Sequence, residues 1–563
     1  MTVLGRLTDR ILGLPGLPVH ATTPPIGVAR DLGVPMPDGV TLLADVHRPR
    51  GGGPLPAVLI RTPYGKGQAL VRLFARVLAR RGFQVVVQDV RGVGGSGGEF
   101  RAFHDERDDG LATLAWLRAQ PWCDGRVATV GASYLGFTQW AVAPYADPPL
   151  EAMGLGITAS EFVSSFYPGG ALALHNTLVW SSLMGTRGGR RGRGGRRGGE
   201  DQRGREDQRG QPGQGARDGR RPLHDRRVRR AMRHLPVGEA DTAAIGRPEP
   251  FLREVTANAE RIAFWEATDH SAHVAATTAP ASMVTGWWDL FLRGQLRDFR
   301  ALHAAGRQAR ITIGPWGHDA KALRAVLADQ VSWLDAHLGG DTAALRRAPV
   351  RLHLQRSGRW LDFEQWPPPG TEPTPLFLSH GLTWDGPSDA EPAAFTYDAL
   401  DPTPNAGGPL LSPGRGGQRD NGRIEARADV AVLTGAPLDR DLDLIGPVSA
   451  TIHVRTSTGH GDLFVRLCDV DRQGVSRNVT DGIVRISSPG LVRAEIEMHP
   501  TGYRFHRGHR LRVMLAGGAF PRFARNHGTG EPAARAVASK RIRFEVHRDV
   551  EHPSSLLLPV WRG

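Results

Sequence analysis

The turn Gly131-Ala132-Ser133-Tyr134-Leu135-Gly136 decides how this 563-residue chain is interpreted. It follows Arg126-Val127-Ala128-Thr129-Val130, a β-branched run typical of a buried strand, and leads into Phe137-Thr138-Gln139-Trp140-Ala141-Val142, which can continue as a helix. A serine on such a turn projects from the carboxyl edge of a sheet, and the small residues let the backbone turn sharply. The pattern predicts a nucleophile elbow, with its second glycine one place later than in G-x-S-x-G.

Two partners for Ser133 follow in the chain. Asp289 comes just after the strand-like run 280–285, and His318 just after the run 309–313. Open α/β sheets place their sites at the ends of such strands. The order Ser, Asp, His is that of α/β-hydrolases. His318 would take the serine proton and return it to the leaving group, while Asp289 would fix the imidazole tautomer.

Each of these residues also has an ordinary explanation. A serine in a glycine turn is usually structural, an aspartate after a strand is often a helix cap, and His318 is one of 21 histidines. The three together, each at a strand end and in the required order, favour a catalytic triad over three coincidences.

At this point the chain resembles a known family, the cocaine esterase and X-Pro dipeptidyl-peptidase group of serine hydrolases (CocE/NonD hydrolases). This group itself uses G-x-S-Y-x-G, which accounts for the late glycine. The resemblance covers most of the chain and rests on seven blocks in order: 34–40, 61–66, 88–100, 122–125, 131–136, 476–482 and 519–526.

The resemblance implies the remaining parts of an active site. Negative charge on the carbonyl oxygen needs preorganised donors, and the family implies the backbone N–H of Tyr134 and the phenol of Tyr64. It also implies that Phe166, Trp180 and Phe291 line an acyl pocket, although ordinary core packing explains each equally well.

The fold class expected is α/β, an α/β-hydrolase sheet with a helical cap insertion, plus a C-terminal all-β domain. Alternating strands and helices indicate a mostly parallel sheet, and the spacing predicts an amphipathic helix from Leu70 to Arg81 with Leu70 on its apolar face. After Pro349 short alternating runs such as 350–354 and 450–454 indicate a sandwich or jelly roll, and the resemblance favours the jelly roll. The expected divisions are 20–157 and 271–345 for the hydrolase domain, 158–270 for the cap and 346–563 for the β-domain.

The net charge of +14 is concentrated in one segment. Residues 187–230 hold 16 Arg against 6 Asp and Glu, which leaves +4 for the rest of the chain. The segment is Gly-rich and has no aromatic residue, so we expect it to be disordered. It is either a polyanion- or RNA-binding arm or a solvated insertion without a partner. The missing aromatics favour the insertion, because stacking on bases needs them.

Several classes of protein are disfavoured. No run of 18 apolar residues occurs, and the start lacks the features of a signal peptide, so a cytoplasmic enzyme without a membrane span is expected. Cys123 and Cys468 are too few for a disulfide framework or metal cluster. Without a HExxH motif, phosphate loop or dinucleotide fingerprint, no cofactor and no metal are expected.

The sequence therefore predicts a serine hydrolase that cleaves a small ester, amide or short peptide through an acyl-enzyme. The first alternative is an Xaa-Pro dipeptidyl-peptidase, which must hold a free α-amine; Glu161 is the nearest candidate acid in the cap. The alternative of a different class is a noncatalytic polyanion- or RNA-binding protein. Oligomeric state is left open, a homodimer included.

Overall fold

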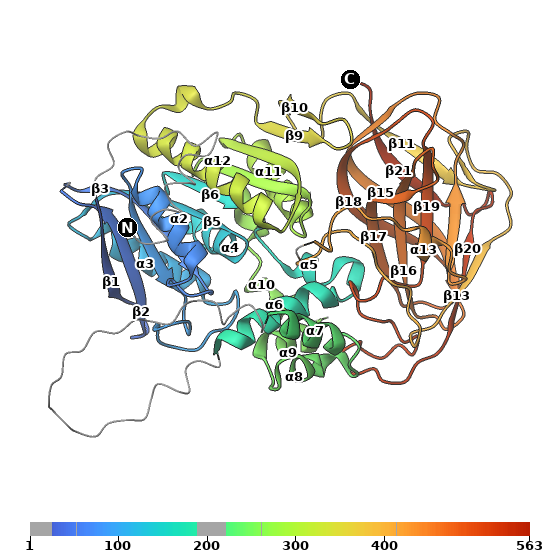
Figure 1. The fold of residues 1–563 in the computed structure, drawn as a ribbon, viewed down its shortest axis with the longest axis horizontal. Coiled ribbons are helices and arrows are strands. Elements are labelled where there is room, and N and C mark those ends of the chain that lie inside the picture. The colour runs from blue at the N-terminus through green and yellow to red at the C-terminus, as the bar shows by residue number, and fades with distance from the viewer. Residues whose placement is uncertain (1–24, 52, 189–220, 260–261, 413) are drawn as a thin grey trace.

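The computed structural model describes residues 25–51, 53–188, 221–259, 262–412 and 414–563. Within them the chain forms an α/β sheet region, a group of helices and a β-rich C-terminal region (Figure 1). The helices of the cap lie between the other two regions, at the bottom of the view. The first 24 residues lie outside the described part.

A ten-stranded mixed sheet forms the core of the N-terminal region. Its strand order is β1-β2-β4-β3-β5-β6-β7-β8-β9-β10. The strands from β4 to β9 run parallel, and antiparallel pairs close both ends of the sheet. The carboxyl ends of the parallel strands therefore share one edge. The strands are β1 Ile26–Pro35, β2 Thr41–Pro49, β3 Leu55–Thr62, β4 Gln84–Asp89, β5 Cys123–Ala132, β6 Ala152–Gly156, β7 Ala281–Trp288, β8 Ala309–Gly317, β9 Val350–Leu354 and β10 Arg359–Phe363.

β9 and β10 lie beyond the expected division at residue 346 but belong to this sheet. The run 350–354 was expected in the all-β domain, but it forms β9, which pairs in parallel with β8 from Ile311↔Val350 onward. The reason is that β8 would otherwise be an open edge with unpaired backbone groups. The alternating burial of β9 suits a strand near the rim of a sheet just as well as a strand of a sandwich.

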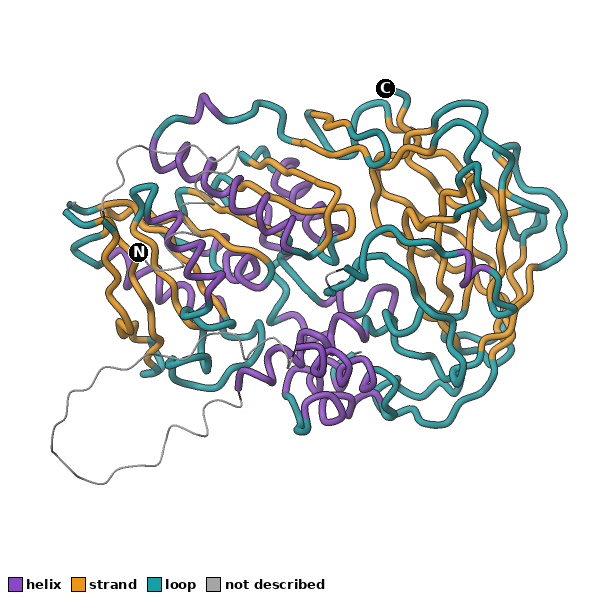
Figure 2. The backbone as a smooth tube through the Cα atoms, viewed as in Figure 1, coloured by secondary structure: helices purple, strands orange, loops and turns teal. Residues whose placement is uncertain are grey.

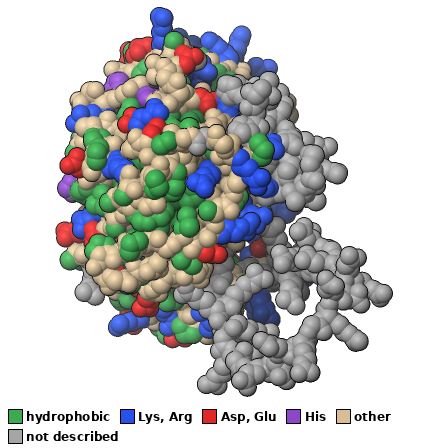
Figure 3. Space-filling view, turned by 90° about the vertical axis from the view of Figure 1, so that its left-hand side faces the viewer, with side chains coloured by type: hydrophobic (Ala, Val, Ile, Leu, Met, Phe, Trp, Pro, Cys, Tyr) green, Lys and Arg blue, Asp and Glu red, His purple; other side chains and the backbone are tan. Residues whose placement is uncertain are grey.

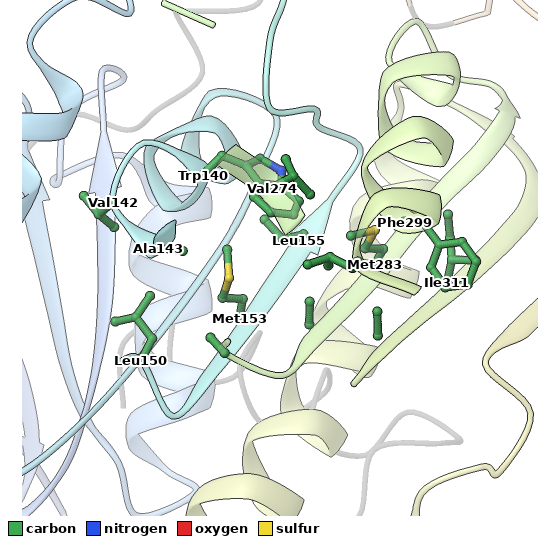
Figure 4. Close-up of a cluster of buried hydrophobic side chains, with 14 of the residues drawn as sticks. Trp140, Val142, Ala143, Leu150, Met153, Leu155, Val274, Met283, Phe299 and Ile311 are labelled. Carbon is green, nitrogen blue, oxygen red and sulfur yellow. The ribbon is translucent and has the colours of Figure 1, made fainter. Parts of the chain in front are cut away.

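Helices cover both faces of this sheet. On one face α2 (Ala69–Ala79) and α12 (Ala320–Gly339) pack on one core cluster, and on the other face α3 (Glu106–Arg118), α4 (Tyr134–Trp140) and α11 (Leu292–Ala304) pack on a second. Figure 4 shows the second cluster, where Trp140 and Phe299 lie over Met153 and Met283. Leu70 was expected on the buried face of α2, but its side chain is 49% exposed because the face that packs is formed by residues such as Phe74.

The cap consists of short helices around an aromatic core. They are α5 Val163–Phe166, α6 Leu174–Gly188, α7 Arg221–Ala231, α8 Ala240–Ile245, α9 Pro250–Ala257 and α10 Ile262–Glu266. The expectation of disorder over 187–230 is wrong for the C-terminal end of that segment, where α7 forms. Val228 and Ala231 are buried in the cap core, and this burial offsets the entropic cost of ordering the helix. Residues 189–220 lie outside the described residues.

The regular secondary structure of the C-terminal region is almost entirely β-strand, joined by long loops (Figure 2). One sheet has the order β12-β11-β21-β15-β20-β13 with β18 also paired to β15, and a second has the order β14-β19-β16-β17. Side chains from both sheets meet in one apolar cluster. The strands are β11 Thr371–Leu378, β12 Leu382–Thr383, β13 Ala393–Tyr397, β14 Val430–Thr434, β15 Leu442–Thr456, β16 Gly461–Val470, β17 Ser476–Ile486, β18 Leu491–Phe505, β19 Arg510–Ala516, β20 Ile542–His547 and β21 Ser555–Trp561, with one short helix, α13 Gly422–Glu425.

None of the helices in the described ranges combines the length and the apolar character needed to cross a membrane.

Candidate active site

Ser133 occupies a strained turn between β5 and α4. Its φ of 59° and ψ of −126° are unusual for a residue with a side chain, and such strain is characteristic of a nucleophile elbow. Glycine is required on both sides. A Cβ on Gly131 would come within 2.5 Å of the Leu135 Cβ, and one on Gly136 within 2.4 Å of the Thr158 methyl group. The late glycine therefore serves the close approach of α4 to the loop after β6.

Asp289 and His318 are brought into direct contact. They directly follow the neighbouring strands β7 and β8, and the His318 Nδ1 lies 2.9 Å from the Asp289 Oδ2. The carboxylate is fully buried, and its other oxygen accepts a hydrogen bond of 2.8 Å from the Phe291 backbone N–H. Asp289 is thus fixed from both sides and can orient the imidazole. Ser133 follows β5 on the same carboxyl edge of the sheet.

The three residues expected in an acyl pocket lie in one buried aromatic cluster that joins the elbow to the cap. Phe166, Trp180 and Phe291 are 5–9% exposed and share this cluster with Tyr134. Phe291 also meets the His318 ring edge-on, with centroids 5.7 Å apart. The cluster also holds aromatic residues that the sequence did not single out: Phe103, Phe137, Phe162, Phe251 and Trp265.

The two tyrosines expected in the oxyanion hole are tied to this cluster in different ways. The Trp180 Nε1–H donates to the Tyr64 hydroxyl at 3.2 Å, which fixes the phenol. The Tyr134 ring is buried, and its hydroxyl donates to Glu106 at 2.8 Å while accepting from the Phe103 backbone N–H at 2.9 Å. Its side chain is therefore structural, and its backbone N–H is the group that begins α4.

A buried ion pair lies next to Tyr134. The Arg61 Nη1 lies 2.8 Å from the Glu106 Oε2, and both side chains are less than 5% exposed. Arg61 stands three residues before Tyr64, and Glu106 holds the hydroxyl of Tyr134. Burial raises the pKa of the Glu106 carboxyl, opposed by the charge of Arg61 and the hydrogen bond from Tyr134.

The β-domain reaches the catalytic edge through His499 of β18. Its ring is hydrogen-bonded to the backbone of Asp289, and burial lowers its pKa to about 3, so it is neutral at ordinary pH. β18 packs on β7 and α11, the elements that flank Asp289. A small cavity behind the Asp289 loop is lined by His499, Arg293 and Asp481. Sequence reasoning missed His499, because no local pattern distinguishes it from other histidines on strands.

Two sequence blocks of the β-domain meet at this cavity. Asp481, from 476–482, accepts from the Arg466 Nη2 at 2.9 Å through one oxygen, while its other oxygen lies 2.7 Å from the Arg522 Nη1, from 519–526. All three side chains are buried. The charges of Arg522 and Arg466 lower the pKa of Asp481 despite a burial effect that acts in the opposite direction. The blocks 476–482 and 519–526 therefore meet in one buried network of charged side chains at this cavity.

Glu161 is already occupied by its neighbours. The Arg297 Nη1 donates to its Oε1 at 2.8 Å, and Ser164 donates to it through both its backbone N–H, at 3.0 Å, and its hydroxyl, at 2.6 Å. The carboxylate is buried and its charge is neutralised. This arrangement stabilises the start of the cap.

A cleft opens on one side of His318, between the sheet region and the β-domain. It encloses about 510 Å³, and its wall combines His318 with the cationic side chains of Lys321, Arg356 and Arg419.

The residues in the described ranges that could hold a metal ion are elsewhere, at the end of β20. On the face of the molecule in Figure 3, basic and acidic side chains are interspersed around hydrophobic ones.

Comparisons with known proteins agree over nearly the whole chain. A family model described as X-Pro dipeptidyl-peptidase (S15 family) matches residues 38–320, and a model described as X-Pro dipeptidyl-peptidase C-terminal non-catalytic domain matches 343–557. Cocaine esterase of Rhodococcus sp. (strain MB1 Bresler) is 31% identical over 95% of this chain and 98% of its own. An aminopeptidase from a marine sediment Thaumarchaeota archaeon has a similar fold, with a TM-score of 0.79 at 20% identity over 97% of this chain and 99% of its own. An α-amino acid ester hydrolase has a TM-score of 0.77 at 21% identity, over the same shares of the two chains.

Proposed function

Because the chain belongs to the X-Pro dipeptidyl-peptidase (S15) family and to its CocE/NonD group, it is a serine hydrolase that acts on esters or peptides, and we propose that it cleaves small esters through an acyl-enzyme on Ser133. The observation that carries the residue assignment is the 2.9 Å contact between His318 and Asp289, on the same sheet edge as the strained Ser133.

The proposed mechanism follows from the order of these groups. His318 removes the Ser133 proton as the hydroxyl attacks the carbonyl carbon, and the neighbouring Asp289 carboxylate stabilises the imidazolium. The Tyr134 N–H and the Tyr64 phenol stabilise the oxyanion. His318 then protonates the leaving alcohol, and water deacylates the enzyme by the same steps in reverse.

The aromatic cluster is proposed to hold the acyl group. Phe166, Trp180 and Phe291 belong to one apolar cluster, in which Trp180 contacts Tyr64 and Phe291 contacts His318, and this favours an apolar or aromatic acyl group.

The state of Glu161 favours the ester over the dipeptide. A dipeptidyl-peptidase needs an uncompensated acid to bind the α-amine of its substrate, whereas Arg297 and Ser164 already satisfy Glu161. Xaa-Pro dipeptidyl-peptidase activity remains the second candidate because the family model carries that name. Nothing in the comparisons supports the polyanion- or RNA-binding alternative.

Three finer features remain predictions. We propose a jelly roll for the two packed sheets of the C-terminal domain, a cytoplasmic location, and functional division of the chain into hydrolase, cap and β-domain. The apolar cluster shared by the two sheets supports the first of these.

Labelling with a fluorophosphonate tests the nucleophile. We expect the native protein and a Ser488→Ala control, changed in the exposed turn between β17 and β18, to be labelled, and Ser133→Ala to be unlabelled. Labelling of Ser133→Ala at the native rate would overturn the assignment. Tyr64→Phe should lower kcat by about 10²–10³ for an ester, with labelling slowed but retained.

Paired assays distinguish the two candidate substrates. p-Nitrophenyl acetate and Ala-Pro-p-nitroanilide are hydrolysed side by side by the native protein and by Ser133→Ala. We expect the ester to be cleaved with the higher kcat/KM. A higher kcat/KM for the anilide would replace the esterase proposal with the dipeptidyl-peptidase.

A further inference from the structure

A group of imidazole and carboxylate side chains lies far along the chain from the triad, where β20 ends. His547 is the last residue of β20, and Asp549 and His552 follow in the loop that leads to β21. One ligand atom from each of the three lies within 4.8 Å of the others. We propose that these three residues form a binding site for a divalent transition-metal ion, with zinc as the ion its ligands suit best.

The distances are close to those a bound ion imposes. The His552 Nδ1 lies 3.0 Å from one Asp549 oxygen, and the His547 Nδ1 lies 3.7 Å from the other. Ligands about 2.0–2.2 Å from a tetrahedral zinc ion stand roughly 3.3 Å apart. Small side-chain rotations therefore suffice to place all three around one ion.

The loop carrying two of these ligands is already held in place. β20 and β21 flank β15 on opposite sides, so the loop between them must cross the end of β15. The buried Ser554 hydroxyl donates to the His547 carbonyl at 2.6 Å and accepts from the His453 backbone N–H at 2.9 Å. The backbone around the proposed site is thus preorganised, which lowers the entropic cost of binding an ion.

His453 of β15 adds a third imidazole beside the two of the site. It stands opposite His547 in the β15–β20 ladder, and its ring centroid lies 5.7 Å from that of His552. The His453 Nδ1 is buried without a hydrogen-bond partner among the described residues, so no protein group occupies this nitrogen there.

The chemistry of the set selects the class of ion. Imidazole nitrogens with one carboxylate suit zinc and its transition-metal neighbours, whereas calcium and magnesium prefer oxygen alone. Arg548 does not compete for Asp549, because its guanidinium donates to the carbonyls of Glu391 and Ser379. A bound ion would tie the crossing loop to β20, which makes the site structural and independent of the proposed esterase activity.

The experiment uses the full-length protein after treatment with EDTA and dialysis. Zn²⁺ alone is titrated by calorimetry, and the metal content of the dialysed complex is measured by mass spectrometry. We expect one Zn²⁺ per chain and a rise in Tm of about 5 °C at a hundredfold excess over Kd. X-ray absorption should show nitrogen and oxygen ligands about 2.0–2.1 Å from the zinc.

Variants assign the ligands. His552→Gln and Asp549→Asn should each weaken Zn²⁺ binding more than 100-fold, and His453→Gln, which changes the neighbouring ring, about 10-fold. The control is His506→Gln, another partly exposed histidine facing an aspartate, whose Nδ1 lies 3.8 Å from Asp441. It should bind like the native chain. Circular dichroism of each variant without metal checks that the β-domain is folded.

Two results would overturn the proposal. One is a native chain that retains less than about 0.1 Zn²⁺ after dialysis and shows no heat of binding, which would mean that the three side chains are only hydrogen-bonded to one another. The other is equal affinity in native protein, His552→Gln and Asp549→Asn, which would place the bound ion elsewhere. Neither result bears on Ser133 labelling, so this proposal and the hydrolase proposal fail separately.

Discussion

Glu106 in the hydrolase domain and Asp481 in the β-domain are both buried carboxylates, yet their pKa values move in opposite directions. The pKa of Glu106 is raised and that of Asp481 is lowered. Each is 3% exposed, so burial does not distinguish them. The difference lies in their cations, because Glu106 faces Arg61 alone while Asp481 lies between Arg466 and Arg522.

The comparison shows that one ion pair does not fully compensate for the burial of a carboxylate, whereas two cations with several hydrogen bonds do. The two networks of buried charges also lie at different parts of the proposed site. The first holds the ring of Tyr134, whose backbone N–H belongs to the proposed oxyanion hole, and the second lines the cavity behind the Asp289 loop, beside His499.

Asp481→Asn gives the largest expected effect. Removing the charge leaves Arg466 and Arg522 buried against each other, so the free energy of unfolding should fall by about 3–5 kcal/mol. Urea denaturation measures it. Asp471→Asn, which breaks a partly exposed pair with Arg477, is the matched control and should cost less than about 1 kcal/mol. Equal costs for the two variants would contradict the proposed role of the buried network.

Glu106→Gln should cost less, about 1–3 kcal/mol, although the side chain is just as buried. The amide oxygen still accepts from the Tyr134 hydroxyl, and Arg61 keeps its bonds to Gln88 and to the Glu106 carbonyl. The same urea titration measures it. A loss as large as that of Asp481→Asn would mean that the number of cations is not what separates the two sites.

His499→Gln tests how the β-domain supports catalysis. We expect kcat for an ester to fall about tenfold, or about 1.4 kcal/mol, with KM little changed, because the backbone of Asp289 loses a fixed partner while the acyl pocket is untouched. His509→Gln, which removes a histidine paired with Asp469 inside the β-domain, should leave kcat unchanged. A similar loss in both variants would indicate general destabilisation instead of positioning.

The smallest expected effect is a difference between Asp481→Asn and Glu106→Gln in how their cost in unfolding free energy changes with pH. Since the folded pKa of Asp481 lies below its ordinary 3.8, its stabilisation is fully present above that pH and is lost only as pH falls further. Since the folded pKa of Glu106 lies above its ordinary 4.5, its contribution is greatest below that pH and declines as pH rises.

Between pH 4 and 8 we therefore expect the cost of Asp481→Asn to stay nearly constant and that of Glu106→Gln to decrease. Unfolding free energies measured across this range check the prediction. A cost of Glu106→Gln that grows with pH would show that Arg61 lowers the pKa of Glu106 and that the two sites behave alike.

Much of the hydrolase domain could be predicted because its signals are local. The strands before Ser133, Asp289 and His318 are short runs rich in apolar and β-branched residues, and each of the three residues follows its strand directly. Leu70 and the run 350–354 were misassigned for one reason: a short pattern indicates a helix or a strand but not the surface against which it packs.

By itself the sequence determined the family, the elbow at Ser133 and the order in which its expected partners follow, because these depend on backbone conformations that neighbouring residues impose. Only the tertiary structure decided that β9 extends the hydrolase sheet, that His499 bonds to the Asp289 loop, that Glu161 is already neutralised and that His547, Asp549 and His552 lie within reach of one ion. Most of these contacts join side chains that are distant in sequence and meet only when sheets pack. The group His547, Asp549 and His552 depends on the path of a loop across β15. Neither residue spacing nor composition along the chain encodes these contacts directly.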